Sequence, residues 1–227
     1  MTPTMPSLIR QRLAAACTLT VLALFASAAH AQATTDSLAG WTVYGDAAAQ
    51  SGAITLTTAY LDGDSDQPSN LSGASAVDIA TLEGGVGVAP YALDLSAQEY
   101  GTEGSAVAQS FAALAGQTLS FDWSFGTLET LFQDRAFVVI DGDVFTLATL
   151  AAPGAATQSF SYTFAQSGIA SLAFGVIDTV DYLGVSTLNV SNLQVISAVP
   201  EPATTTMVLA GLAFVGAVVR RRQPRRA

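Results

Sequence analysis

Three carboxylates occupy alternate positions of one short loop, at Asp62, Asp64 and Asp66. In a turning backbone this one-three-five spacing brings oxygens towards one point, which suits Ca²⁺. The loop departs from the EF-hand pattern, because Gln67 stands at its sixth position and Gly73 at its twelfth. A calcium site here would therefore borrow ligands from elsewhere, and a solvated acidic loop is the alternative interpretation.

A second set of acidic residues flanks two other loops that follow apolar strand patterns. Glu129 and Asp134 flank the first of these loops, and Asp178 and Asp181 flank the second. If both loops gather at one end of the fold, the four side chains form a second candidate metal cluster. Ordinary turn residues are the alternative.

Pairs of carboxylates are also the catalytic groups of glycoside hydrolases. In a chain this acidic such pairs arise by chance, so a hydrolase is the least favoured of the functions considered.

The best aromatic candidates for a sugar site lie in predicted loops, at Tyr60, Tyr91, Tyr100 and Tyr182, and two of them, Tyr60 and Tyr182, stand beside acidic turns. A ring with an apolar face and a polar tip next to carboxylates is expected of a carbohydrate site, and equally of a tyrosine at the rim of a domain. Trp123 is a weaker candidate, because it is in phase with Phe121 and Phe125 and is therefore predicted to lie in the core.

Much side-chain chemistry is absent from this chain. It contains no lysine, and its single cysteine and single histidine, Cys17 and His30, lie in the N-terminal leader described below. Histidine triads, cysteine nucleophiles, His-ligated zinc and lysine Schiff bases are therefore excluded. We expect a protein that is not an enzyme.

Charge is distributed unevenly along the chain. Between Gln32 and Val199 there are seventeen acidic residues and one cation, Arg135, so this region carries a net charge of −16. Such a surface repels the phosphates of nucleic acids and favours divalent cations. Nucleic acid is accordingly not an expected partner, and Ca²⁺ is the expected cofactor if there is one.

Strand patterns recur between the two ends of the chain. Residues 118–125 and 158–164 alternate apolar and polar side chains, and 136–140 and 172–177 are continuous apolar runs typical of central strands. Asp141-Gly142 predicts a hairpin turn, and Ser191-Asn192 a bulge. These patterns predict an all-β fold, a jelly-roll-like antiparallel β-sandwich. Residues 62–104 are predicted to form long loops, with a helical turn at 92–99.

The N-terminus has the three parts of a secretory signal peptide. Arg10 and Arg12 precede an apolar run over 13–25, and Ala29-His30-Ala31 supplies the small residues at Ala29 and Ala31 that signal peptidase requires. We expect a signal peptide over 1–31 and a sandwich domain over 32–198.

The C-terminal segment 199–227 also has three parts. Val199-Pro200-Glu201-Pro202 precedes an uncharged stretch over 203–219, which is followed by a basic cluster over 220–226 that begins Arg220-Arg221-Arg222. Seventeen helical residues span roughly 25 Å, a short transmembrane helix. Its arginines would stay in the cytoplasm, so the tail would halt export at the inner membrane.

This arrangement resembles the PEP-CTERM sorting signal of Gram-negative bacteria, on Val199 to Pro202, Ala210 to Phe214 and Arg220 to Arg222. The resemblance implies processing by an exosortase and an association with exopolysaccharide and biofilm. The central domain is similar to sandwich domains often found ahead of this signal, on residues 121–125, Glu129 and 134–142.

The preferred hypothesis is an exported structural or adhesive protein that uses Ca²⁺. It would pass through the inner membrane to the cell surface or extracellular matrix of a Gram-negative bacterium. A carbohydrate-binding module that holds extracellular polysaccharide is the second hypothesis.

Overall fold

The computed structural model of the chain describes residues 35, 37–61, 69–149, 156–197 and 211–212. Its folded part consists of short and medium strands and one helix. In chain order these are β1 (Thr42–Tyr44), β2 (Asp46–Gln50), β3 (Ala53–Thr57), β4 (Val77–Asp78), α1 (Ile79–Val86), β5 (Gly101–Ala113), β6 (Thr118–Thr127), β7 (Arg135–Ile140), β8 (Asp143–Ala148), β9 (Gln158–Thr163), β10 (Gly168–Thr179) and β11 (Ser186–Ile196).

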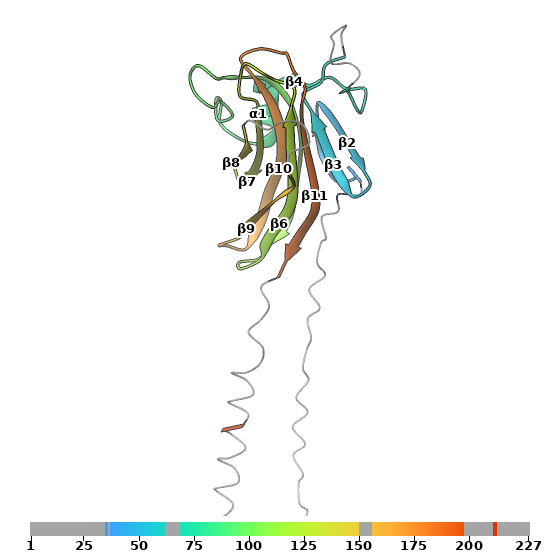
Figure 1. The fold of residues 1–227 in the computed structure, drawn as a ribbon. Coiled ribbons are helices and arrows are strands. Elements are labelled where there is room, and N and C mark those ends of the chain that lie inside the picture. The colour runs from blue at the N-terminus through green and yellow to red at the C-terminus, as the bar shows by residue number, and fades with distance from the viewer. Residues whose placement is uncertain (1–34, 36, 62–68, 150–155, 198–210, 213–227) are drawn as a thin grey trace, which may run out of the picture.

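The strands form two sheets that pack face to face (Figure 1). The first sheet has the order β1-β5-β10-β7-β8, with β4 added on β5, and the second has the order β2-β3-β11-β6-β9. All of these strand pairs are antiparallel. The predicted all-β, jelly-roll-like antiparallel β-sandwich is therefore confirmed.

The main core lies between the sheets and follows the alternation read in the sequence. On β6 the side chains of Leu119, Phe121, Trp123 and Phe125 are all buried, while the intervening positions face outwards. Trp123 is 5% exposed, so its predicted place in the core is confirmed. Phe121 meets Phe174 of the other sheet edge to face, with ring centroids 4.8 Å apart.

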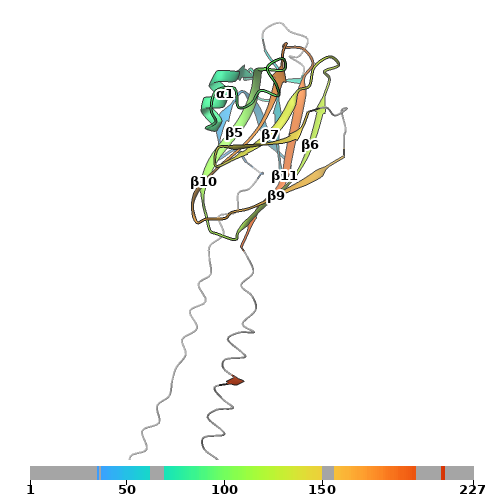
Figure 2. The same cartoon turned by 90° about the vertical axis from the view of Figure 1, so that its left-hand side faces the viewer.

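The continuous apolar runs become the central strands β7 and β10, as predicted. Both are buried on their two faces, because α1 covers the outer face of the first sheet (Figure 2). Leu82 and Val86 of α1 join a second core cluster with Phe137, Val139 and Ile177. A strand covered on both sides has no polar face to keep, so its sequence shows no alternation.

The stretch predicted as loops contains more structure than expected. Asp78 caps α1 by accepting a hydrogen bond from the Thr81 amide at 3.0 Å, and Gly87 ends the helix with a left-handed φ of 79°. The helix has only eight residues and contains Gly84 and Gly85, which weaken its sequence signal. Residues 92–99 form successive turns and bends instead of the predicted helical turn.

The two local irregularities read from the sequence are confirmed. Asp141 and Gly142 both have a positive φ in the turn between β7 and β8. The pairing of β11 with β6 shifts its register between Ser191 and Gln194, where Asn192 takes a φ of 52°.

The sandwich has two unlike ends. At one end β3, β6 and β10 finish and β5, β7 and β11 begin, so the described loops 58–61, 69–76, 87–100, 128–134 and 180–185 gather there; we call it the loop end. At the other end, the tail end, β11 finishes beside the start of β6. Thr35, which precedes the first strand, bonds to Gly52 of the β2–β3 turn at this same tail end.

No helix in the described ranges is long and apolar enough to cross a membrane. Of the predicted transmembrane segment, only Gly211 and Leu212 are described, and they are helical. The signal peptide with Ala29 and Ala31, the motif Val199 to Pro202 and the arginines 220–222 all lie outside the described residues.

Candidate functional site

Backbone hydrogen bonds join the loops of the loop end to one another. The Val180 amide donates to the Tyr100 carbonyl at 3.0 Å, and the Leu128 amide donates to the Val185 carbonyl at 3.1 Å. The Thr102 hydroxyl donates to the carbonyl of Asp181 at 2.7 Å. Loops that are far apart in the sequence are thereby held as one surface.

Three tyrosines on this surface are exposed. Tyr91 is 80% exposed, Tyr100 is 47% exposed and Tyr182 is 56% exposed. The Asp94 amide donates to the Tyr91 carbonyl at 3.3 Å, and the Asp94 carboxylate accepts from the Gly101 amide at 2.9 Å. With the bond between residues 180 and 100, these contacts join the loop segments that carry the three tyrosines, which we together call the tyrosine strip.

Two buried charged groups fix the loop that carries Tyr91. The Glu83 carboxylate of α1 accepts hydrogen bonds from the amides of Tyr91 and Leu93, at 3.0 and 3.1 Å. From β7, the guanidinium of Arg135 donates to the Leu93 carbonyl at 3.0 Å. Tyr91 itself has a left-handed φ of 66°, a strained conformation that such anchoring can maintain.

Beneath the loops, an acid row crosses the inner face of the first sheet. Glu103 of β5 lies opposite Asp178 of β10, and Asp134 immediately precedes β7, the strand on the other side of β10. All three are buried, with exposed fractions of 1% to 2%. The sequence alternation that points Val107, Val138 and Val176 inwards also points these carboxylates inwards.

Hydroxyl groups from the second sheet meet one end of the acid row. Asp134 accepts hydrogen bonds from the hydroxyls of Ser186 at 2.6 Å and Thr127 at 3.0 Å. In contrast, both carboxylate oxygens of Asp178 are buried; the side chains of Thr58 and Asp134 are near them, but no described residue makes a hydrogen bond of normal geometry to them. The free energy of an ionised carboxylate in such a place is high.

The pKa values of Asp134 and Asp178 follow from this environment. Burial raises the pKa of Asp178 far above its ordinary value, and the negative charge of Asp134 raises it further. Burial also raises the pKa of Asp134, to about 6, although the hydroxyls of Ser186 and Thr127 lower it in part. Asp178 is therefore the member of the pair that keeps a proton near neutral pH.

The structure brings together only part of the predicted second metal cluster. Asp134 and Asp178 meet in the acid row. Glu129 instead accepts hydrogen bonds from the amides of Thr130 and Leu131, and Asp181 accepts from the Leu183 amide at 3.1 Å. Within the described ranges, no three acidic, cysteine or histidine side chains converge as a metal site would require.

The other predicted site residues are the three aspartates of the calcium loop and the two tyrosines beside acidic turns. Asp62, Asp64 and Asp66 lie outside the described residues, so the calcium hypothesis for their loop stays a prediction. Tyr182 is exposed in the tyrosine strip, whereas Tyr60 is only half-exposed on the β3–β4 connection.

Sequence reasoning missed three buried acids, Glu83, Glu103 and Asp46. Asp46 accepts hydrogen bonds from the amides of Leu71 and Ser72, and so fixes the β3–β4 connection. Glu103 is in phase with Val107 and Phe111, an alternation that could have identified it as inward-facing. The neighbouring glycines, Gly101 and Gly104, weakened the strand pattern there.

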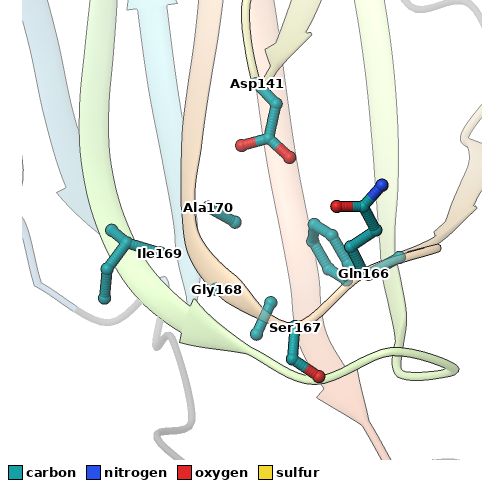
Figure 3. Close-up of a pocket in the computed structure, with 8 residues that line it drawn as sticks. Asp141, Gln166, Ser167, Gly168, Ile169 and Ala170 are labelled. Atoms are coloured by element: carbon teal, nitrogen blue, oxygen red, sulfur yellow. The ribbon is translucent and has the colours of Figure 1, made fainter.

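Two hollows lie away from the loop end. One, of about 190 Å³, is at the tail end, where Figure 3 shows Asp141 and Gln166 beside the start of β10. The Asp141 carboxylate accepts a hydrogen bond from the Ser171 amide there. The other, of about 320 Å³, is an uncharged groove between α1 and β5, lined by Tyr44 and Ser110 among others. The ring of Tyr44 packs closely on Gly85.

Residues 198–223 match the PEP-CTERM protein-sorting motif. This confirms the sorting signal predicted from the sequence. The motif implies that the protein is exported and that an exosortase processes its C-terminus. The search against curated proteins found no match.

Several solved structures of carbohydrate-binding modules are similar in fold. One, described as CBM4 structure and function, is 16% identical, with a TM-score of 0.37, over 72% of this chain and 98% of its own. The N-terminal cellulose-binding domain of a Cellulomonas fimi β-1,4-glucanase is 16% identical, with a TM-score of 0.34, over 73% and 94%. A third, TmCBM61 in complex with β-1,4-galactotriose, is 8% identical, with a TM-score of 0.35, over 72% and 92%. Likenesses this distant carry no conclusion about function.

Proposed function

We propose that this exported protein is a non-enzymatic domain of the cell surface or extracellular matrix that binds extracellular polysaccharide through the tyrosine strip. The observation that carries the proposal is the exposure of three rings, Tyr91, Tyr100 and Tyr182, on loops that hydrogen bonds join to one another. A structural or adhesive role follows from it, because a surface protein that holds polysaccharide joins the cell to its matrix.

The chemistry of the strip suits a sugar. A tyrosine offers an apolar ring face against which the C–H face of a pyranose can pack, and a hydroxyl that bonds to sugar hydroxyls. Glu83 and Arg135 hold the backbone of the loop that carries Tyr91, so that backbone has little conformational entropy left to lose when a ligand binds.

The burial of the carboxylate pair favours binding over hydrolysis. A glycosidase requires an acid and a second carboxylate on either side of the scissile bond, open to substrate. Asp134 and Asp178 are each 1% exposed beneath the loops, so a sugar ring has no access to them.

The test is affinity electrophoresis of the exported protein through gels that contain the extracellular polysaccharide of its host. Replacing Tyr91, Tyr100 and Tyr182 together with alanine should abolish the retardation, with single replacements giving partial losses. Ile169→Ala is the matched control, because this side chain is 76% exposed at the start of β10, near the tail end.

A further variant separates the strip from the uncharged groove. Ser110 is exposed on β5 and lines that groove, so Ser110→Trp should obstruct it without touching the loops. Unchanged retardation in the triple tyrosine variant would contradict the proposal. Loss of binding in Ser110→Trp alone would place the sugar site in the groove.

A further inference from the structure

The mature domain presents no exposed positive charge. Between Gln32 and Val199 the only cation is Arg135, and its side chain is 6% exposed. The guanidinium is engaged beneath the 87–100 loop by the carbonyl of Leu93, and the negative charge of Asp94 acts on it. Because seventeen acidic residues share this region, an anionic polymer that approaches the loop end meets repulsion without any compensating contact.

Carboxylates accompany each member of the tyrosine strip. Asp94 is linked by hydrogen bonds to the backbone on both sides, at Tyr91 and Gly101. Glu99 precedes Tyr100, and Asp181 precedes Tyr182. The Asp94, Glu99 and Asp181 side chains are all half-buried, so they remain in contact with solvent.

Resting on the proposed function, we infer that the polysaccharide held by the strip carries protonated amines, as a partly de-N-acetylated amino-sugar polymer does. An ammonium group gains from a carboxylate beside it and from the face of a tyrosine ring. A neutral sugar would use only the rings. Each tyrosine of the strip has a carboxylate within three residues of it, so the loop end offers both kinds of group to an amine-bearing chain.

The experiment compares polymers of one backbone and length that differ only in acetylation. The probes are fully N-acetylated and partly de-N-acetylated poly-β-1,4-glucosamine, at a pH where the free amines are protonated, with a neutral glucan and alginate beside them. We expect the de-N-acetylated polymer to bind at least about tenfold more tightly than the acetylated one. This advantage should shrink as salt is added, since these charges are near the surface.

Two sets of variants show whether the preference for the amine-bearing polymer depends on the carboxylates of the loop end. Glu99→Gln with Asp181→Asn removes two charges and retains the Oδ1 acceptor for Leu183, and it leaves in place Asp94, whose charge acts on the buried Arg135. The pair should lower the affinity for the de-N-acetylated polymer several-fold and leave the acetylated polymer unaffected. Asp143→Asn with Asp122→Asn removes two charges away from the loop end, on β8 and β6, and should change neither affinity.

The outcomes distinguish this inference from the function on which it rests. Equal affinity for both glucosamine polymers, or for the neutral glucan, would overturn the amine inference and leave polysaccharide binding in place. An equal loss in the two double variants would overturn it too, because attraction would then come from overall charge. Binding to none of the polymers, including the host's own, would overturn both.

Discussion

Asp178 is a carboxyl group whose surroundings favour the neutral form. The residue is 1% exposed and lies opposite Glu103, and its pKa is raised above all by burial. In the unfolded chain the same side chain would lose its proton near the ordinary pKa of about 4. The folded state therefore binds more protons than the unfolded state above that pH.

The sign of the pH dependence follows from this difference. Where the folded state holds more protons, stability falls as the pH rises. The contribution of Asp134 and Asp178 to the free energy of unfolding is thus fully present below their pKa in the unfolded chain. It is lost progressively as the pH rises through the raised pKa of Asp134 and then that of Asp178 in the folded state.

We predict that Asp178→Asn flattens this dependence. Asparagine has the shape of the neutral acid and no charge to bury, so the variant should melt above the wild type at about pH 8 and lose that advantage at about pH 5. Thermal unfolding by circular dichroism measures both. Asp122→Asn is the control, since Asp122 is half-buried on the outward side of β6 and hydrogen bonds from Ser159 and Asn192 lower its pKa. A wild type that gains stability from pH 5 to pH 8 relative to Asp178→Asn would contradict the prediction.

At the scale of elements, the β6–β7 and β10–β11 loops depend on one close approach. Gly184 has a φ of +79°, and a Cβ placed there would lie 2.8 Å from the Cα and the amide nitrogen of Glu129. Only glycine both tolerates this conformation and leaves room for the neighbouring backbone. The exposed side chains of Leu128, Leu131, Tyr182 and Leu183 are carried by the two loops that meet here.

We predict that Gly184→Ala destabilises the domain by at least about 1 kcal/mol through backbone strain, with a further cost from the contact with Glu129. Polysaccharide retardation should weaken as well, because Tyr182 is two residues away. Gly168→Ala is the matched control: no atom lies within 4 Å of its added Cβ, and we expect a change within about 0.5 kcal/mol. Urea unfolding of the three proteins gives the comparison, and equal midpoints would show that the loops separate freely.

The same elements show what a sequence can predict about this fold. Strands with one buried face were predictable, because alternation on β6 reports directly which side chains meet the core. The small helix α1 was not, since its amphipathic pattern spans two turns and contains two glycines. The acid row was half predictable: Asp134 and Asp178 stand beside strong strands, whereas Glu103 stands between glycines. Whether these three carboxylates come together depends on the order of strands in the sheet, which local sequence patterns do not encode.

The strip was predictable only as a list of tyrosines in loops. The chain places Tyr91 and Tyr182 far apart in sequence, and the bonds that link them pass through Asp94, Gly101 and Tyr100. Loop conformations of this kind are fixed by tertiary contacts, here from Glu83 and Arg135, and not by local propensity.

At the scale of the whole molecule, the large negative net charge is a reason to test whether the domain binds calcium. A domain with a net charge of −16 between Gln32 and Val199 repels itself, and Ca²⁺ bound by Asp62, Asp64 and Asp66 would relieve that repulsion. At a hundredfold excess over Kd, a ligand of the folded state adds about 2.7 kcal/mol. We predict a melting temperature about 5 to 10 °C higher in Ca²⁺ than in EDTA.

Two comparisons make the calcium prediction specific. Mg²⁺ at matched ionic strength should do much less, because it dehydrates reluctantly and demands octahedral geometry. Asp62→Ala with Asp64→Ala should remove most of the calcium effect and leave the domain folded. Coinciding unfolding curves in EDTA, Mg²⁺ and Ca²⁺ would mean that the loop is a solvated acidic turn.

The binding surface and the sorting signal lie at opposite ends of the sandwich. β11 finishes at the tail end, only a few residues before the sorting motif begins at 198, while the tyrosine strip belongs to the opposite, loop end (Figure 1). A protein held through its C-terminal segment would therefore direct the strip away from the point of attachment. Processing of the tail and binding of polysaccharide should then be separable.

We predict that replacing Pro200, Glu201 and Pro202 with alanine leaves unprocessed protein in the inner membrane, because these residues distinguish the sorting motif from a plain apolar anchor. Membrane fractionation and the mass of the C-terminal peptide measure the outcome. After detergent extraction, this variant should still be retarded by the host polysaccharide as strongly as the wild type, since its loop end is intact. Normal release of the variant would show that the motif is dispensable. Retention in the membrane with loss of binding would show that the strip functions only after the tail has been processed.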